Sequence, residues 1–427
     1  MSRPEPRGAA AVTGIGVIAP NGADTEAFWK STKEGISALD RITREGCDRL
    51  PLRVAGEVRD FDPAAAVEER YLVQTDRFTH FALAAADLAL ADAGLGHADS
   101  DGSPSSPLSP FAVGVVTAAG SGGGEFGQRE LQNLWSKGSR FVGPYQSIAW
   151  FYAASTGQIS IRRGYKGPCG VVASDEAGGL DALAHAARTV ARGTGAVVAG
   201  STEAPLAPYS MVCQLGYGEL STAAEPDRAY RPFTAGACGF VPAEGGALLV
   251  VEDEVSARER GARVRAVLAG HAATFTGAAR RAESREGLAR AIRGALDEAG
   301  CAPEEIDVVF ADALGVPEAD RAEALALADA LGGHGTRVPV TAPKTGIGRA
   351  YGAAPVLDTA AAVLAMEESL IPPTPHVFDV CHDLDLVTER ARPAELRTAL
   401  VLSRGLMGSN SALVLRAPAT QQRRRTA

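Results

Sequence analysis

The stretch from Cys169 to Val190, CGVVASDEAGGLDALAHAARTV, constrains the fold of this chain more than any other. A short apolar run at 170–173 ends in Ser-Asp-Glu, and apolar residues then recur at helical spacing from Leu180. This pattern predicts a buried strand, a sharp turn and a buried helix. Such a turn directs the side chain at its apex, near Glu176, toward the unpaired N–H groups and the positive dipole end of the helix. An enzyme would place a nucleophile at this position.

The composition excludes several classes of function. The chain has 427 residues, of which 46% are hydrophobic, and this is enough for a large core. Its formal net charge of −9 argues against a nucleic-acid binder, so we expect small-molecule or protein partners. The six cysteines lack the paired spacings of a zinc site or a disulfide framework, so we expect free thiols and no metal. We find no signal peptide and no membrane-spanning run, and we therefore expect a cytoplasmic protein with no membrane partner.

Strand and helix patterns alternate through both halves of the chain. Apolar runs predict strands at 9–19, 111–117, 170–173, 196–200, 247–251, 306–311, near 338, 398–402 and 411–415. The helical spacing of apolar residues predicts helices at 25–34, 71–95, 125–137, 146–162, 286–298, 319–331 and 355–368. This alternation predicts an α/β body whose helices pack against two sheets.

A glycine-rich segment, GSGGGEFG at 120–127, follows a predicted strand and contains the pattern G-x-G-x-x-G at Gly122, Gly124 and Gly127. A dinucleotide site begins in this way. Five glycines in eight residues produce the pattern easily, however, and it lies deep in the chain, so we predict no cofactor. A dinucleotide-binding protein stays as an alternative that NADH titration would test. The nearest match to the hydrolase motif G-x-S-x-G, at 119–123, lacks its first glycine.

Three segments resemble a known family. The turn and helix at 176–182 read EAGGLDA and resemble the C-T-S-G-L-D-A nucleophile elbow of the β-ketoacyl synthases, members of the thiolase superfamily. The segments RPF at 231–233 and GFVPAEG at 239–245 are similar to the R-P-F-D and G-F-V-x-x-E-G signatures of the same family. The resemblance implies an α/β class, the duplicated five-layer αβαβα thiolase-like fold. It would cover residues 8–417 as halves 8–255 and 256–417, with disordered tails at 1–7 and 418–427.

The groups that the family uses for decarboxylative condensation are missing. Glu176 stands at the position of the family's cysteine, and Leu314 stands where the segment A-H-G-T carries the first histidine. Arg349 replaces the second histidine in the segment KTGIGRAYGA at 344–353, while Lys344 is retained. A carboxylate cannot hold an acyl chain as a stable thioester, and neither leucine nor arginine can act as the missing imidazole. The chain alone is therefore not expected to condense acyl groups, and its catalytic site is degenerate.

The retained polar residues have structural explanations. We expect Arg349 to pair with Glu176 or with Asp175, because a lone buried charge would be costly. Lys344 and the two carboxylates of the segment DRAE at 320–323 fit a structural network better than a catalytic one. The segment GLMGSN at 405–410 resembles the synthases' G-F-G-G-x-N loop, with Leu406 at the position of the gating phenylalanine.

With three catalytic positions lost inside a preserved frame, the chain resembles the chain length factor, the β ketosynthase subunit of bacterial type II aromatic polyketide synthases. The segments WFYA at 150–153 and TGQISIR at 156–162 agree with it. Chain length factors commonly carry glutamine at the cysteine position, so Glu176 is a departure. The resemblance implies a heterodimer with a catalytic ketosynthase subunit that supplies the cysteine and both histidines. It also implies an acyl carrier protein that carries malonyl and polyketide chains, in antibiotic biosynthesis.

The resemblance further implies a tunnel for the growing poly-β-ketone at the dimer interface. The family's gate positions fall at Gly124, Gly127 and Leu131. These small side chains predict a roomy tunnel and a product longer than an octaketide, and Gly124→Phe should then shorten the product. The alternative for the glycines is that they only serve a tight turn. The alternative for the whole chain is a stand-alone malonyl-carrier-protein decarboxylase, or a divergent 3-oxoacyl-carrier-protein synthase, that uses Glu176 and Arg349.

Overall fold

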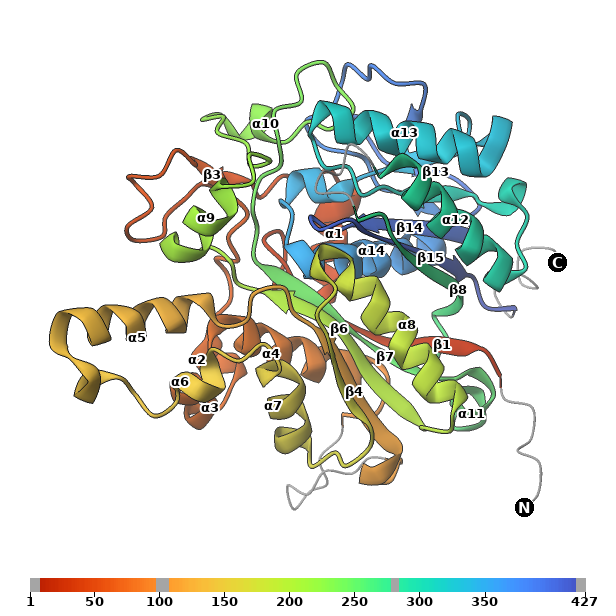
Figure 1. Ribbon diagram of the computed structural model, residues 1–427. Coiled ribbons are helices and arrows are strands. Elements are labelled where there is room, and N and C mark those ends of the chain that lie inside the picture. Colours follow the sequence, from red (N-terminus) through yellow and green to blue (C-terminus); the bar gives the residue numbers. More distant parts are fainter. Residues whose placement is uncertain (1–7, 97–106, 278–283, 420–427) are drawn as a thin grey trace.

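The computed structural model describes residues 8–96, 107–277 and 284–419, so the predicted tail at 1–7 and most of the one at 418–427 lie outside the described residues. Eleven strands form one large twisted sheet in the order β12-β10-β9-β14-β15-β8-β1-β7-β6-β4-β5 (Figure 1). The strands from the first part of the chain are β1 (Ala10–Ile18), β4 (Val113–Ala118), β5 (Cys169–Val172), β6 (Ala196–Glu203) and β7 (Gly245–Asp253). Those from the second part are β8 (Ala266–Phe275), β9 (Val308–Phe310), β10 (Pro339–Thr341), β12 (Asp385–Leu386), β14 (Thr398–Arg404) and β15 (Ser409–Arg416).

The two parts of the sheet repeat one topology. In the first part, β1 pairs antiparallel with β7, β7 antiparallel with β6, and β6, β4 and β5 run parallel. In the second part, β8, β15, β14, β9 and β10 follow the same order with the same directions. The parts join where β1 pairs with β8 at Ala11–Val267 and Val12–Ala266. The predicted duplication is therefore present, although the two predicted sheets are hydrogen-bonded into one.

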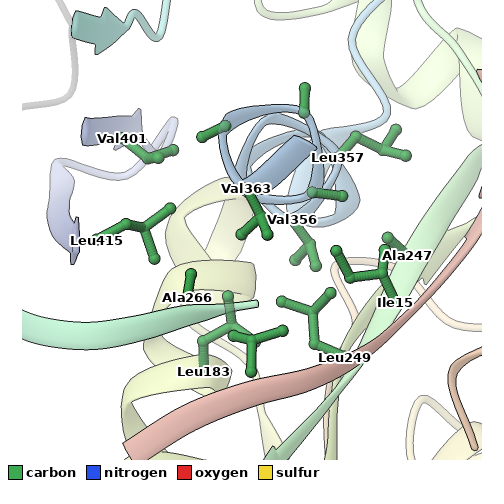
Figure 2. Packing of buried hydrophobic residues seen from close by; sticks show 14 of the residues in the cluster. Ile15, Leu183, Ala247, Leu249, Ala266, Val356, Leu357, Val363, Val401 and Leu415 are labelled. Atoms are coloured by element: carbon green, nitrogen blue, oxygen red, sulfur yellow. The ribbon is translucent and has the colours of Figure 1, made fainter. Parts of the chain in front are cut away.

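The larger helices make three layers around this sheet. Helices α8 (Gly178–Ala191) and α14 (Ala354–Glu368) lie between its two parts, where their apolar side chains meet those of β1, β7, β14 and β15 (Figure 2). Helices α4 (Arg77–Asp92) and α7 (Ala154–Arg163) cover the outer face of the first part, and α12 (Arg285–Ala299) and α13 (Pro317–Leu331) cover that of the second. The predicted five-layer α/β fold is confirmed.

The remaining elements are short or peripheral. The helices are α1 (Thr25–Lys33), α2 (Pro63–Ala66), α3 (Glu69–Gln74), α5 (Gly124–Lys137), α6 (Gln146–Ala149), α9 (Pro208–Leu215), α10 (Pro226–Ala229) and α11 (Glu254–Glu259). Two small ladders pair β2 (Asp40–Arg41) with β3 (Val54–Ala55) and β11 (Leu370–Ile371) with β13 (Arg392–Pro393). Helix α5 extends away from the body of the molecule (Figure 1). Within the described residues, no helix combines the length and apolar character needed to span a membrane.

Two predicted helices differ from the structure, and one strand was not predicted. The helix predicted at 71–95 is two helices, because Thr75 is extended and the Asp76 side chain accepts a hydrogen bond from the Phe78 N–H at 3.2 Å to cap a new helix. The helix predicted at 146–162 breaks between α6 and α7. Strand β8 was not predicted, because its alanines and Gly270 give a weak strand pattern.

Candidate functional site

The predicted elbow is a left-handed turn between β5 and α8. Asp175 adopts φ 59°, and a short 3₁₀ turn over Asp175–Ala177 leads into α8. A Cβ atom on Gly179 would lie 2.3 Å from the Gly352 carbonyl oxygen and 2.6 Å from Val356 Cγ2, so only glycine lets the elbow approach α14 this closely. This approach places Glu176, which is buried, beside the segment that carries Arg349.

Arg349 binds two carboxylates at once. Its Nε donates to Glu176 Oε2 at 2.6 Å, and its Nη2 donates to Asp312 Oδ1 at 2.6 Å. Burial lowers the pKa of Arg349, but the charges of Asp312 and Glu176 outweigh burial and hold its pKa well above the ordinary value. The predicted pairing of Arg349 with Glu176 is confirmed, and the Nη1 and Nη2 of the guanidinium also donate to the Asp312 and Arg404 carbonyl oxygens.

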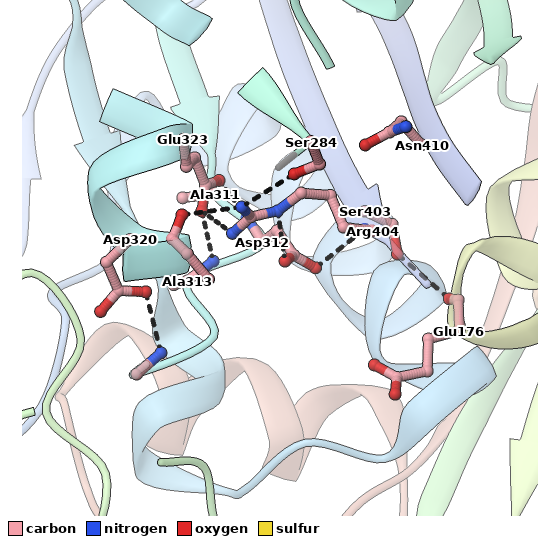
Figure 3. Close-up of polar contacts among 12 residues, drawn as sticks. Glu176, Ser284, Ala311, Asp312, Ala313, Asp320, Glu323, Ser403, Arg404 and Asn410 are labelled. Carbon is pink, nitrogen blue, oxygen red and sulfur yellow. Dashed lines mark hydrogen bonds and ion pairs between the residues drawn. The ribbon is translucent and has the colours of Figure 1, made fainter. Parts of the chain in front are cut away.

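A second buried arginine, Arg404, shares Asp312 with Arg349, and Figure 3 shows its contacts with Asp312 and Glu323. Arg404 Nε donates to Asp312 Oδ2 at 2.9 Å, and its Nη2 donates to Glu323 Oε2 at 2.8 Å. Glu323 also accepts the backbone N–H groups of Asp312 and Ala313 at 2.7 and 2.9 Å. The sequence motifs did not indicate Asp312 or Arg404. Their place in the sequence could have indicated them, because Asp312 directly precedes the family segment at 313–316 and Arg404 directly precedes the one at 405–410.

The other residues singled out in the sequence have packing roles. Lys344 Nζ lies 2.5 Å from Asp358 Oδ2 and donates to the Ala311 carbonyl oxygen at 2.7 Å, and all of these groups are buried. Burial raises the pKa of Asp358 to about 6, despite the opposing charge of Lys344. Leu314 is fully buried in an apolar cluster with Tyr230 and Phe240. Neither the retained lysine nor the leucine is arranged to activate a nucleophile.

A cavity of about 240 Å³, the elbow cavity, opens in front of Glu176. Its lining consists of Gly120, Ser121, Asp175, Glu176, Glu203, Pro205, Gln214, Tyr217, Glu219, Leu220, Phe240, Tyr351 and Leu406. Glu203 ends β6, is buried and accepts the Gly120 N–H at 2.5 Å. Burial raises the pKa of Glu203 to about 8, and the negative charge of Glu176 adds to this shift. At neutral pH, Glu203 is therefore an uncharged acid.

A second cavity of about 430 Å³, the gate cavity, adjoins the first. Its lining consists of Ser121, Gly123, Gly124, Gly127, Gln128, Leu131, Gln146, Trp150, Tyr209, Ser210, Cys213 and Gln214. The structure therefore brings the three predicted gate residues together on the cavity side of α5. The two cavities share Ser121 and Gln214.

The G-x-G-x-x-G segment has a packing explanation. A Cβ atom on Gly123 would lie 2.0 Å from the Ala149 carbonyl oxygen, and one on Gly122, where φ is +69°, would lie 2.5 Å from the Trp150 carbonyl oxygen. The first glycines therefore let the turn after α6 lie against the start of α5. Gly127 is less constrained, since a Cβ atom there would meet Trp150 Cδ1 at 3.4 Å.

The site cannot perform the chemistry that its frame suggests. The elbow presents a carboxylate in an ion pair where acyl transfer needs a free thiolate, and an ion-paired guanidinium stands where a proton-transferring imidazole would be needed. Within the described residues, no group of three or more histidine, cysteine or acidic side chains is placed to hold a metal ion. The site retains two adjoining cavities, the elbow cavity and the gate cavity.

Comparisons with known proteins agree with this geometry. Residues 9–257 match the family model of the β-ketoacyl synthase N-terminal domain, and residues 265–378 match that of its C-terminal domain. A Streptomyces coelicolor protein named as a polyketide β-ketoacyl synthase 2 is 77% identical over 407 residues, which are 95% of this chain and 94% of that protein.

Solved structures show the same fold. The ishigamide ketosynthase/chain length factor superposes with a TM-score of 0.86 at 27% identity, over 97% of this chain and 100% of that chain. A type II polyketide ketosynthase, solved with its acyl carrier protein and bound to a hexaketide, gives a TM-score of 0.83 at 26% identity, over 97% and 100% of the two chains. The chain therefore belongs to the β-ketoacyl synthase family, among the chain length factors of the type II polyketide synthases.

Proposed function

We propose that this chain is the chain length factor of a heterodimeric type II polyketide ketosynthase, and that it shapes the tunnel in which the poly-β-ketone grows. The observation that carries this proposal is the buried ion pair of Glu176 and Arg349. It fills the positions of the nucleophile and of one imidazole with two groups that neutralise each other. The preserved frame then serves assembly and shape, while condensation takes place on another subunit.

The partner is a catalytic ketosynthase subunit that supplies the cysteine and both histidines. Its substrates arrive on an acyl carrier protein, the class of protein that is bound in the solved ketosynthase complex. The ishigamide assembly combines a ketosynthase with a chain length factor and supports the same arrangement here. We also infer a cytoplasmic location, which suits six cysteines that form no disulfide.

The face that would receive this partner combines an open sheet edge with exposed apolar side chains. Strand β5 is the last strand of the sheet on this side, and Cys169 is exposed. The adjacent turn exposes Trp150, Phe151 and Tyr152 by 56%, 43% and 45%. Aromatic clusters of this kind are typical of protein interfaces. Because these side chains are so exposed, the aromatic cluster is not part of this chain's own core.

The gate positions are Gly124, Gly127 and Leu131 on α5. They line the gate cavity with almost no side-chain volume at the two glycines, so a chain that enters it meets no barrier there. We therefore expect a longer product than that of relatives with bulkier side chains at these positions.

Reconstitution tests the proposed function. The purified chain, the ketosynthase subunit and malonyl-loaded carrier protein should together form a poly-β-ketone, while this chain alone should release no carbon dioxide. The two subunits should also co-purify as a heterodimer. Carbon dioxide release by this chain alone, abolished in Glu176→Ala, would instead support the stand-alone decarboxylase.

A further inference from the structure

We propose that the elbow cavity, which no longer serves condensation, receives the distal end of a long poly-β-ketone that has passed the gate helix α5. This inference rests on the proposed function and adds a second chamber to the tunnel. Product length would then depend on the elbow cavity as well as on the gate.

The gate cavity and the elbow cavity adjoin each other. The gate cavity and the elbow cavity share Ser121, which precedes α5, and Gln214, which lies on α9. A chain that fills the gate cavity therefore has the elbow cavity directly ahead of it. The glycines at 124 and 127 add no side chains to the α5 face of the gate cavity, while Leu131, Trp150 and Tyr209 line other parts of it.

Gln214, at the junction of the two cavities, is held weakly. Gln214 Nε2 donates to the Pro205 carbonyl oxygen at 3.5 Å, which is at the long limit of a hydrogen bond. Within the described part of the chain, the buried Gln214 Oε1 has no hydrogen-bond partner. Little is lost when such a side chain turns aside, and its amide can then bond to an oxygen of the passing chain.

The lining of the elbow cavity matches the chemistry of a polyketone. Leu220, Phe240 and Leu406 provide apolar walls for the methylene groups. Glu203 faces this space as an uncharged acid, since burial raises its pKa to about 8, and it can donate a proton to a ketone oxygen in a hydrogen bond. Of the other acids in the lining, Glu176 is paired with Arg349, Asp175 accepts the Met407 N–H, and Glu219 adds a further carboxylate.

The elbow cavity is large enough for the end of such a chain. An engineered protein cavity of roughly 150 Å³ holds benzene, a ring of six carbon atoms. The elbow cavity of about 240 Å³ therefore has room for about two to three two-carbon units with their oxygens.

The test fills the elbow cavity without touching α5. In the reconstituted heterodimer, Leu406→Trp should shorten the main product by about two to three ketide units, as measured by mass spectrometry. The matched control is Met407→Trp, because the neighbouring Met407 side chain is 61% exposed and lies outside the cavity lining. Met407→Trp should leave the product length unchanged.

A double variant makes the test sharper. Gly127→Phe closes the gate before the chain reaches the elbow cavity, so Gly127→Phe with Leu406→Trp should give the same product as Gly127→Phe alone. A wild-type product length from Leu406→Trp, with Gly127→Phe still shortening the product, would overturn this inference and leave the proposed function intact. If Leu406→Trp prevents assembly, Leu406→Phe decides the question by the same measurement. A wild-type heterodimer that makes no polyketone would instead refute the proposed function.

Discussion

Arg349 is the residue on which the degenerate elbow depends. It is buried and lies between the carboxylates of Glu176 and Asp312, and Arg404 binds the other oxygen of Asp312. Each of these carboxylates therefore contacts at least one arginine, and each arginine contacts more than one carboxylate or carbonyl oxygen. Replacing a catalytic cysteine and histidine by such a pair retains the close packing of the elbow against α14.

Removing the cation should be much costlier than removing one acid. Arg349→Met leaves the buried Glu176 carboxylate without its cation and removes one of the two cations that bind Asp312, and it should lower the free energy of unfolding by about 3–5 kcal/mol. Glu176→Gln keeps an oxygen that can accept the Arg349 Nε–H and should cost less. Urea denaturation of the purified variants measures both. The control is Lys33→Met, which breaks the exposed pair with Glu368 and should cost less than about 1 kcal/mol. An Arg349→Met cost no larger than that control would contradict the structural role of the network.

Glu203 should make the stability of this chain depend on pH. Its pKa is raised from the ordinary 4.5 to about 8, so between these values the folded state holds a proton that the unfolded state has lost. The contribution of Glu203 to the free energy of unfolding is therefore largest below about pH 4.5, falls as the pH rises, and is lost above about pH 8. Glu203→Gln cannot ionise, so its advantage over wild type should grow with pH by up to about 1.4 kcal/mol per unit. Denaturation from pH 5 to 9 measures this, with the exposed Glu259→Gln as the control. A difference that stays constant across this range would contradict the shift.

Part of this site could be predicted from the sequence, for a clear physical reason. Glu176 and Arg349 lie inside motifs whose spacing fixes their place, so their pairing could be expected. Asp312 and Arg404 meet because β9 pairs with β14 in the register Phe310–Val401, and Glu203 reaches Gly120 because β6 pairs with β4. Strand register joins residues that are distant in sequence, and no local pattern carries it.

At the scale of elements, local patterns predict regular segments better than interruptions. The elbow and α5 have nearly the predicted bounds, because each shows a clear apolar spacing. The breaks at 75–76 and 150–153 depend on a capping side chain and on the close approach of another loop. The weak pattern of β8 arises at Gly270, where a Cβ atom would lie 2.3 Å from the Ala295 carbonyl oxygen of α12. Close packing against α12 therefore requires glycine at this position, and glycine lacks the side chain that would have indicated a strand.

The face of α5 that lines the gate cavity should control product length. Gly127→Phe should shorten the product, because its new Cβ atom meets nothing closer than 3.4 Å and its ring can fill the cavity. Gly124→Phe should also shorten the product, but with a lower yield of assembled protein, since its Cβ atom would lie 2.3 Å from Ser210 Oγ. Mass spectrometry of products from the reconstituted heterodimer measures both. Gln132→Phe, on the same helix but outside this cavity, is the control. Unchanged length in both glycine variants would leave the glycines with only their packing role.

At the scale of the whole molecule, the sheet ends at an edge that needs a partner. The Val115 N–H donates to the Pro168 carbonyl oxygen, and the Ala119 N–H donates to that of Val172, so alternate residues of β5 bond to β4. The residues between them, Cys169 and Val171, direct their backbone groups to the open side. An edge of this kind, flanked by exposed aromatic side chains, is suited to pairing with another chain.

Val171→Pro should weaken assembly selectively. Proline removes an N–H group that points to the open side, so the ladder with β4 stays intact while a bond to the partner subunit is lost. We expect the dissociation constant of the heterodimer to rise by about tenfold or more, equivalent to about 1.4 kcal/mol. Sedimentation of mixed subunits measures this, and the melting temperature of the variant alone should stay close to wild type. Phe378→Ser is the control, because it removes an apolar side chain that is 70% exposed outside this face. Equal affinities for wild type, Val171→Pro and Phe378→Ser would show that β5 is not the edge that meets the ketosynthase subunit.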